Sequence, residues 1–209
     1  QRTYGPWDNS DLAASLMPSK TTNEILKKYK DTISIEALEK IDKKEIKERE
    51  KFKQVLFLLK KSGWELINKK MTNTDTNEIL NFEVITNQNK MKKLLLVWKD
   101  KLKKTGIALS IKILDSSQFQ NRIQSFDFNA IIFEYYMSLS PGNEQSIYWG
   151  SWASDQKGSR NYAGIKHPAI DEVIKKISNA KNRSELIEYT RTLDRLLRAG
   201  HWIIPLYHD

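Results

Sequence analysis

Four consecutive segments in the middle of the chain indicate its fold: FEVIT at residues 82–86, MKKLLLVWKDKL at 91–102, IALSIKI at 107–113 and FNAIIF at 128–133. The first is rich in β-branched and aromatic residues, which favours a strand. The second repeats apolar residues every three or four positions, which predicts an amphipathic helix. The third alternates strictly, and the fourth is a nearly continuous apolar run, typical of a strand that is covered on both faces.

A second, shorter helix is predicted between the last two of these segments. Ser116 or Ser117 can cap it, and Phe119, Ile123 and Phe126 give it an apolar face. The order is therefore strand, helix, strand, helix, strand. Because parallel strands are joined by right-handed crossovers, this order predicts an α/β fold with a mainly parallel sheet flanked by helices.

The preceding part of the chain is predicted to begin with an irregular segment, Gln1–Lys20, in which Gly5-Pro6 and Pro18 interrupt regular structure. Thr22–Lys47 is interpreted as two short helices or a charged linker. A helix is expected to end before Gly63, and a hairpin is expected around Asn68. The apolar stripe of that helix consists of Phe52, Val55, Leu56 and Leu59.

Two amphipathic helices and a short strand are predicted at the C-terminal end. Pro168 suits the first position of a helix, and Gly200 suits the residue after one. Trp202–Leu206 fits a short strand at an edge, because it contains a proline. The first helix has the apolar stripe Ile170, Val173, Ile174 and Ile177, and the second has Leu186, Tyr189, Thr190, Leu193 and Leu197.

Composition excludes some classes of function. The chain has 209 residues, no cysteine and a formal net charge of +9. Without cysteine there are no disulfides, no thiolate metal sites and no cysteine nucleophile. No apolar run approaches the roughly 20 residues that span a bilayer. We see neither a signal-peptide pattern nor an initiator methionine, and we interpret the chain as a processed, trimmed or partial product.

The positive charge admits two interpretations. Lysines are mixed with glutamates from Glu36 to Lys61, which favours a solvated, lysine-rich surface. The alternative is a nucleic-acid-binding module, since lysine and arginine neutralise phosphates. No recognised nucleic-acid motif accompanies the charge, so we do not expect nucleic acid as a partner.

Candidate binding residues follow the last strand of the predicted sheet. In open α/β sheets, ligands bind beyond the carboxyl ends of the strands. Tyr136, Ser140 and Asn143 are therefore placed to meet a ligand. Ser140 stands before Pro141 and also fits a plain helix N-cap, so both interpretations stay open.

The irregular stretch that follows adds aromatic and polar candidates. Trp149 offers a stacking surface for a side chain or a peptide plane, although tryptophan is also a common core residue. Arg160 and Asn161 supply a forked cation and an amide, which suit a carboxylate or backbone groups. A solvated Arg160 without a binding role is the plain alternative.

No catalytic, metal or cofactor site is predicted. Glu134 and Glu144 could form a carboxylate pair for glycoside hydrolysis, but nothing in the sequence fixes their separation. The three histidines show no metal-ligand spacing. The glycine motifs that bind phosphates or dinucleotides are absent from the sequence. We therefore predict a binding protein rather than an enzyme.

Motifs spaced along almost the whole chain resemble one known family. They are NSDLAAS at 9–15 with Pro18-Ser19, FDF at 126–128 with LSPGNEQ at 139–145, GSRNYAGI at 158–165 followed by Pro168 and Asp171, and Leu193-Asp-Arg to Pro205. With these motifs the chain resembles the extracellular solute-binding proteins of family 5, the oligopeptide- and dipeptide-binding components of ABC importers. Within that family it is most similar to the YejA-like branch.

The resemblance implies a type II periplasmic binding protein, in which two α/β lobes close on an extended peptide. This chain would supply most of the second lobe, with an irregular, hinge-proximal segment of short helices at residues 1–48 and the α/β lobe at 49–209. The first lobe would be a missing partner. The resemblance further implies a peptide or peptide-like ligand, an ABC permease in the inner membrane, a periplasmic location and no cofactor. An inactive partial product is a further alternative.

Overall fold

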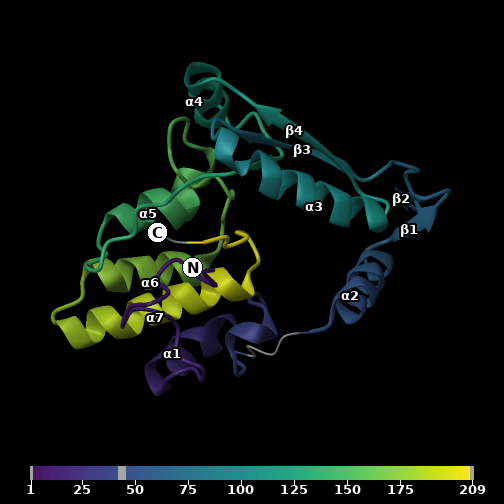
Figure 1. Cartoon of the computed structure of the whole chain (residues 1–209). Coiled ribbons are helices and arrows are strands. Elements are labelled where there is room, and N and C mark those ends of the chain that lie inside the picture. Colours follow the sequence, from purple (N-terminus) through teal and green to yellow (C-terminus); the bar gives the residue numbers. More distant parts are fainter. Residues whose placement is uncertain (1, 42–45, 208–209) are drawn as a thin grey trace. The chain divides into compact units, whose positions relative to one another are not determined.

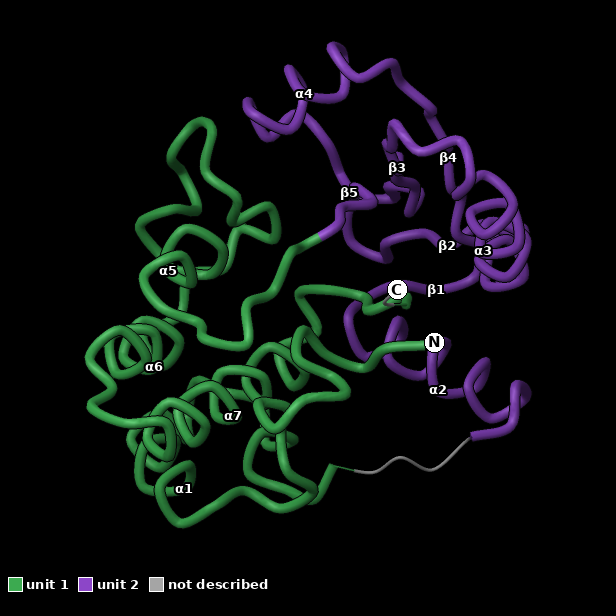
Figure 2. The backbone as a smooth tube through the Cα atoms, turned by 60° about the vertical axis from the view of Figure 1, so that its left-hand side comes forward, with its two compact units in different colours: residues 1–43, 135–209 green, residues 44–134 purple. Residues whose placement is uncertain are grey.

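The computed structural model describes residues 2–41 and 46–207, and it divides into two compact units (Figure 2). Unit 1 combines Gln1–Lys43 with Tyr135–Asp209, and unit 2 is Lys44–Glu134. Unit 2 is thus a continuous segment between the two parts of unit 1.

This grouping differs from the division between residues 1–48 and 49–209 that we expected from the sequence. The N-terminal segment shares a hydrophobic core with the C-terminal helices, and its Leu12 and Leu26 are completely buried there. No local pattern in the sequence predicts this association, because the contacting residues lie more than a hundred positions apart in the chain.

A three-stranded parallel sheet forms the centre of unit 2 (Figure 1). β3 (Asn81–Thr86) lies between β4 (Ala108–Ile113) and β5 (Ala130–Ile131), and it is parallel to both. In the register of β3 with β4, Val84 pairs with Ile111. The predicted parallel sheet is therefore confirmed.

The helix predicted between the first two of these strands is α3 (Lys92–Lys104). Its Leu95 is buried in a cluster with Val84 of β3 and Leu109 of β4, and Trp98 packs against the same cluster. Leu95, Trp98 and Leu102 of the apolar stripe predicted for this helix face the sheet, whereas Leu94 of the same stripe is 43% exposed.

The second connecting helix is α4 (Ser116–Gln124), and its cap differs from the prediction. The capping residue is Asp115, not Ser116 or Ser117. A carboxylate oxygen of Asp115 accepts a hydrogen bond from the N–H of Gln118 at 2.8 Å. The helix begins one residue earlier than a serine cap would allow, and a carboxylate at this end also complements the helix dipole.

The strand predicted at Phe128–Phe133 is much shorter than expected, since β5 contains only Ala130 and Ile131. A side chain explains its late start. The Oδ1 atom of Asn129 accepts the N–H of Glu83 at 3.0 Å, so the backbone of β3 bonds to an amide side chain there.

A helix and a hairpin complete unit 2. α2 (Glu48–Lys61) ends before Gly63, whose φ of +79° suits glycine, as predicted. β1 (Trp64–Ile67) pairs antiparallel with β2 (Lys70–Asn73). The two turn residues between these strands have φ of 50° and 64°, which is typical of a type I′ hairpin.

Unit 1 is largely helical. Its N-terminal part contains α1 (Lys20–Leu26) and the 3-10 helices η1 (Lys27–Tyr29) and η2 (Ile35–Ala37). These short helices agree with one interpretation of Thr22–Lys47, while residues 42–45 of that segment lie outside the described residues.

The C-terminal part of unit 1 contains α5 (Glu144–Trp149), η4 (Ser151–Asp155), α6 (Pro168–Ser178) and α7 (Arg183–Ala199). As predicted, α6 begins at its proline and α7 is followed by Gly200. Across residues 2–41 and 46–207, every helix is too short or too polar to cross a membrane.

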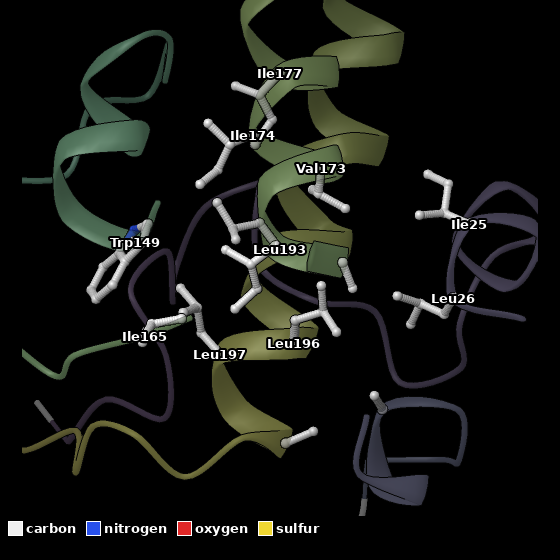
Figure 3. Packing of buried hydrophobic residues seen from close by; sticks show 14 of the residues in the cluster. Ile25, Leu26, Trp149, Ile165, Val173, Ile174, Ile177, Leu193, Leu196 and Leu197 are labelled. Carbon is white, nitrogen blue, oxygen red and sulfur yellow. The ribbon is translucent and has the colours of Figure 1, made fainter. Parts of the chain in front are cut away.

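The core of unit 1 lies around α6 and α7 (Figure 3). Apolar side chains from both helices lie between Trp149 on one side and Ile25 and Leu26 on the other. Leu186 and Tyr189 of the second predicted stripe are only partly buried against this cluster. The buried members of the predicted stripes are Ile170, Val173, Ile174, Ile177, Thr190, Leu193 and Leu197.

The expected strand at Trp202–Leu206 is absent from the part of the chain that the structure describes. Only an isolated bridge between Arg2 and Tyr207 marks this region. Trp202 and Ile203 instead pack against the helical core. The segment is held by this packing and by a backbone hydrogen bond in which the N–H of Thr3 donates to the carbonyl of Leu206 at 3.4 Å.

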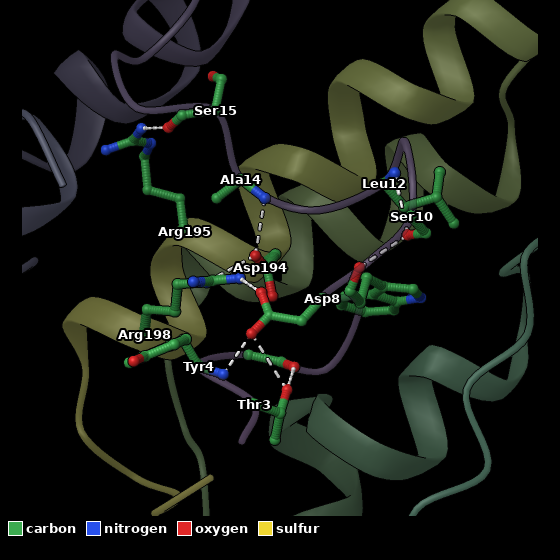
Figure 4. Close-up of polar contacts among 12 residues, drawn as sticks. Thr3, Tyr4, Asp8, Ser10, Leu12, Ala14, Ser15, Asp194, Arg195 and Arg198 are labelled. Atoms are coloured by element: carbon green, nitrogen blue, oxygen red, sulfur yellow. Dashed lines mark hydrogen bonds and ion pairs between the residues drawn. The ribbon is translucent and has the colours of Figure 1, made fainter. Parts of the chain in front are cut away.

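Buried charges hold the N-terminal segment on α7 (Figure 4). Asp194 accepts the N–H of Ala14 at 2.8 Å, and Arg198 forms ion pairs with both Asp194 and Asp8. Arg195 donates to two backbone carbonyls of the N-terminal segment. These contacts tie together residues about 180 positions apart.

Candidate functional site

Three aromatic rings of unit 1 surround Tyr135, and we call these four side chains the aromatic cluster. The centroid of the Tyr135 ring lies 4.9 Å from that of Trp149, 5.6 Å from that of Tyr148 and 6.4 Å from that of Tyr162. Tyr135 and Tyr148 meet edge to face, at an interplanar angle of 80°. Ring quadrupoles favour this geometry, so the cluster is held in place by packing as well as by burial.

Trp149 forms the buried base of the aromatic cluster. Its side chain has no exposed surface, and its Nε1–H donates to Oε1 of Gln145, one turn earlier in α5, at 3.0 Å. Trp149 is therefore a core residue, which was the alternative interpretation, and the expectation that its ring stacks on a ligand is corrected. An enclosed ring with a satisfied donor has no surface to offer a molecule from solution.

Asn161 is the second predicted binding residue that the structure buries completely. Its Nδ2 donates to the carbonyls of Gly150 and Ile165, both at 2.9 Å, and its Oδ1 accepts the N–H of Ile165 at 2.9 Å. The expected contact between this amide and a ligand is thus replaced by contacts with the chain's own backbone. Asn161 closes the loop of residues 158–165.

Arg160 is the exposed charge beside the aromatic cluster. Its guanidinium carbon lies 5.9 Å from the centre of the Tyr148 ring, and Nη1 is 3.4 Å from the Tyr148 hydroxyl. The hydroxyl of Tyr135 donates to the carbonyl of Arg160 at 3.2 Å. A cation over an aromatic face is attracted to the ring, so this side chain has a preferred position although it remains exposed.

The phenols of Tyr135 and Tyr162 stay protonated at physiological pH, because their pKa values are raised. Burial raises the pKa of Tyr135 well above its ordinary value of 10, and the neighbouring tyrosines add to this rise against the opposing effect of Arg160. Burial likewise raises the pKa of Tyr162. Tyr135 and Tyr162 therefore present neutral hydroxyl groups beside the guanidinium of Arg160.

The two candidates directly after the sheet are exposed. The Tyr136 side chain is 78% exposed. Ser140 is exposed as well, and its N–H donates to the side chain of Ser138 at 2.9 Å. Ser140 is not a helix cap, because α5 begins four residues later.

Asn143 lies at a different place from Arg160, at the start of α5. It borders two shallow grooves on the surface of α5 and α6, of about 290 and 430 Å³. The larger groove is also bordered by Trp152, Asp171 and Lys175. Asn143 occupies the cap position but makes no capping bond with its side chain, which leaves the amide available.

The six predicted residues therefore do not form one constellation. Arg160 and the aromatic cluster make a single patch, with Trp149 and Asn161 beneath it. Tyr148 and Tyr162 complete that patch and were not predicted, since an isolated tyrosine in an irregular stretch carries no periodic signal. The four-residue spacing of Gln145 and Trp149 was the available hint that the tryptophan faces inward.

The chemistry of this patch is that of binding. Its side chains that reach solvent are the guanidinium of Arg160 and the partly exposed phenols of Tyr135 and Tyr162, which form hydrogen bonds and stacking contacts. A search of the described ranges finds no group of three or more His, Cys, Asp or Glu side chains that could hold a metal ion.

The comparisons with known proteins agree with a binding role. Residues 18–159 match the model of the bacterial extracellular solute-binding proteins, family 5 middle. The probable peptide-binding protein YejA of Agrobacterium fabrum is 36% identical over 213 residues, which is 100% of this chain and 35% of the relative. The peptidoglycan-binding protein YepA of the same organism is 37% identical over 161 residues, 77% of this chain and 26% of the relative.

A solved structure shows the same fold. The oligopeptide-binding protein AppA of Bacillus subtilis, in complex with a nonapeptide, matches with a TM-score of 0.66 at 19% identity, over 90% of this chain and 39% of that protein. The predicted fold class, an α/β lobe of the type II periplasmic binding proteins, is confirmed. The chain matches 35% of the length of the YejA relative and 26% of the length of the YepA relative.

Proposed function

Because this chain belongs to the bacterial extracellular solute-binding proteins of family 5, we propose that it is part of the substrate-binding component of an ABC importer. The ligand is a peptide or a peptide-like compound, captured in a cleft that this chain closes together with a further lobe. The name of the YejA relative, a probable peptide-binding protein, supports this ligand class.

Arg160 above the aromatic cluster is the observation that carries the proposal. A peptide presents carboxylate and carbonyl oxygens, and a guanidinium binds such oxygens with charge-assisted hydrogen bonds. The contact with Tyr148 limits the positions of the Arg160 side chain before any ligand arrives. A preset donor loses less conformational entropy on binding, which favours affinity.

The remaining predicted residues divide into two roles in this proposal. Tyr136, Ser140 and Asn143 are exposed and contact the ligand or the further lobe. Trp149 and Asn161 act beneath the surface: they fix the ring of Tyr135 and the loop that carries Arg160.

The partners and location follow from the same proposal. An ABC permease in the inner membrane receives the ligand from the closed protein, and the protein works in the periplasm. The chain catalyses no reaction and needs no cofactor. The relatives named above carry the names of binding proteins, which supports this assignment.

Two alternatives predict different results. A basic nucleic-acid-binding module would bind DNA or RNA with an affinity that falls steeply with salt concentration, whereas capture of a peptide in a closed cleft would not. An inactive partial product would bind neither a peptide nor a nucleic acid.

Calorimetric titration of the protein at the length of its relatives tests the proposal. The panel contains free peptides and peptidoglycan-derived peptides, because one relative is named for peptidoglycan. We expect a saturable complex that Arg160→Ala weakens about tenfold or more, the loss of one charge-assisted bond. Arg183→Ala is the matched control, since Arg183 is an exposed arginine of the same unit that pairs with Asp11. Equal affinity of the Arg160 and Arg183 variants, or no binding across the panel, contradicts the proposal.

A further inference from the structure

The outward face of α3 carries exposed aliphatic and lysine side chains that have no part in the proposed ligand binding. The inward face of α3 packs Leu95, Trp98 and Leu102 on the sheet. On the other side, Leu96 is 45% exposed and Val97 is 56% exposed. Two large aliphatic side chains thus stand in solvent on a helix whose orientation is fixed by its own core. Figure 1 shows α3 lying along β3 and β4.

Lysines surround these aliphatic side chains. α3 contains six lysines and a single acidic residue, Asp100. Lys93 lies one turn before Val97 and borders the exposed apolar pair, Asp100 lies one turn after Leu96, and Lys103 lies a further turn along the same side of the helix. Unit 2 contains 18 Lys and Arg against 11 Asp and Glu, and it carries +7 of the chain's net charge of +9. The positive charge is therefore concentrated in the unit that presents this face.

Whether the positive charges belong to lysine or to arginine distinguishes among possible anionic partners. Protein interfaces are enriched in arginine and aromatic residues and depleted in lysine, yet α3 contains no arginine and its one aromatic ring, Trp98, faces the sheet. Single-stranded nucleic acids bind to exposed aromatic platforms, which this face also lacks. Lysines combined with aliphatic side chains are the pattern by which helices lie on anionic lipid surfaces.

We propose that the outward face of α3 docks the protein on an anionic phospholipid bilayer. The lysines lie among the lipid phosphates, where they need no fixed geometry. Leu96 and Val97 enter the boundary between headgroups and acyl chains. The helix remains parallel to the surface, because its inward face stays bound to the sheet.

Vesicle flotation of the 209-residue chain tests this proposal. One set of vesicles is phosphatidylcholine alone, and the other contains about 30% phosphatidylglycerol, a share that gives the surface a negative potential. We expect binding to the anionic vesicles, weakened by salt because surface charges are screened, and little binding to the neutral ones. Equal binding to both sets of vesicles, or binding to neither, overturns the proposal.

Two pairs of lysine substitutions test whether the vesicles bind to the outward face of α3. Lys93→Gln with Lys103→Gln should weaken binding about 25-fold, since each lysine near an anionic surface contributes roughly fivefold. The control pair Lys157→Gln with Lys181→Gln, exposed lysines of unit 1, should change binding less than about twofold. An equal loss in the two pairs overturns the proposal, because it would assign binding to net charge alone.

A second pair of variants tests the apolar contact. Leu96→Ser with Val97→Ser should weaken binding, whereas Ile35→Ser should not, although Ile35 is 62% exposed in unit 1. These positions are exposed, so circular dichroism should show an unchanged fold. Unaltered vesicle binding by the double serine variant overturns the proposal. Retention of duplex DNA or self-association through α3 without vesicle binding overturns it as well.

Discussion

Arg198 and Asp194 form an ion pair within one turn of α7, with Nε 2.7 Å from Oδ2, and the carboxylate of this pair has no exposed surface. Burial raises the pKa of Asp194, and Arg198 and the N–H of Ala14 offset this only in part. The other oxygen, Oδ1, has no hydrogen-bond partner among the described residues. Arg198 therefore supplies the counter-charge for the buried carboxylate that accepts the N–H of Ala14.

Replacing Arg198 should destabilise unit 1 strongly. Arg198→Ala leaves a buried carboxylate without its counter-charge, and breaking such a pair costs about 3–5 kcal/mol. Urea unfolding followed by tryptophan fluorescence measures the change. Arg183→Ala is the control: its exposed pair with Asp11 should contribute less than about 1 kcal/mol. Similar losses of unfolding free energy in the two variants would mean that the buried ion pair contributes no more to stability than the exposed one.

Asp8 should make stability depend on pH. Burial alone would raise its pKa, but hydrogen bonds from the Tyr4 N–H and from Arg198 outweigh it and hold the pKa below the ordinary 3.8. A lowered folded-state pKa contributes stability above pH 3.8, and this contribution disappears as the pH falls through the folded value.

The comparison of the protein with its Asp8→Asn variant measures this effect. Their difference in unfolding free energy should be constant from pH 7 to about pH 5 and should shrink below 3.8. The pKa of Asp194 shifts in the opposite sense, and because the charge of Asp8 adds to that rise, the measured difference includes the interaction between the two carboxylates. A difference that grows on acidification would show that Asp8 is not stabilised as a carboxylate.

Asn161 should matter for stability and Asn143 should not. Asn161→Ala removes three hydrogen bonds and leaves buried groups of Gly150 and Ile165 unpaired, which costs about 1–3 kcal/mol for each unsatisfied group. We expect a total loss of roughly 3 kcal/mol or more in chemical unfolding. Asn143→Ala, at an exposed cap position without a capping bond, should change stability by less than about 0.5 kcal/mol. The reverse ranking would return Asn161 to the set of ligand contacts.

Gly106 should tolerate no side chain. Gly106 and Gly158 have nearly equal φ, +79° and +82°, but an added Cβ at Gly106 would lie 2.4 Å from the Leu66 side chain and 2.8 Å from the Met71 nitrogen, whereas Gly158 has open space. Gly158→Ala should cost about 1–2 kcal/mol for the left-handed backbone. Gly106→Ala should cost about 1–3 kcal/mol more, because the backbone of β2 must move. Thermal unfolding of the two variants separates crowding from backbone strain, and equal melting temperatures would refute the crowding.

The 209-residue chain by itself should bind peptides weakly. One face of a cleft leaves the ligand solvated, and its contacts must offset ordering costs of several kcal/mol. Calorimetry with the peptide panel above should give a dissociation constant above about 1 µM, equivalent to less than about 8 kcal/mol of binding free energy. A submicromolar complex of this chain alone would show that no second lobe is needed.

The sequence by itself determined the order of the elements. FEVIT at 82–86 and IALSIKI at 107–113 became neighbouring parallel strands, and the apolar stripe of α6 and most of that of α3 face their cores, because helix and strand periods are local properties. The proline at the start of α6 and Gly63 after α2 were predictable for the same reason. Family motifs also identified the fold before any coordinate was known.

Only the tertiary structure decided which side chains are buried and which units form. An asparagine amide can bond equally well to a ligand or to its own backbone, and the closing of the loop at 158–165 fixed this choice for Asn161. Trp149 became a core residue because Tyr135 covers it, and β5 stayed short because the side chain of Asn129 bonds to β3. Residues 1–43 joined 135–209 through contacts such as Asp8 with Arg198. Such contacts join residues far apart in the chain, so no local pattern of the sequence reports them.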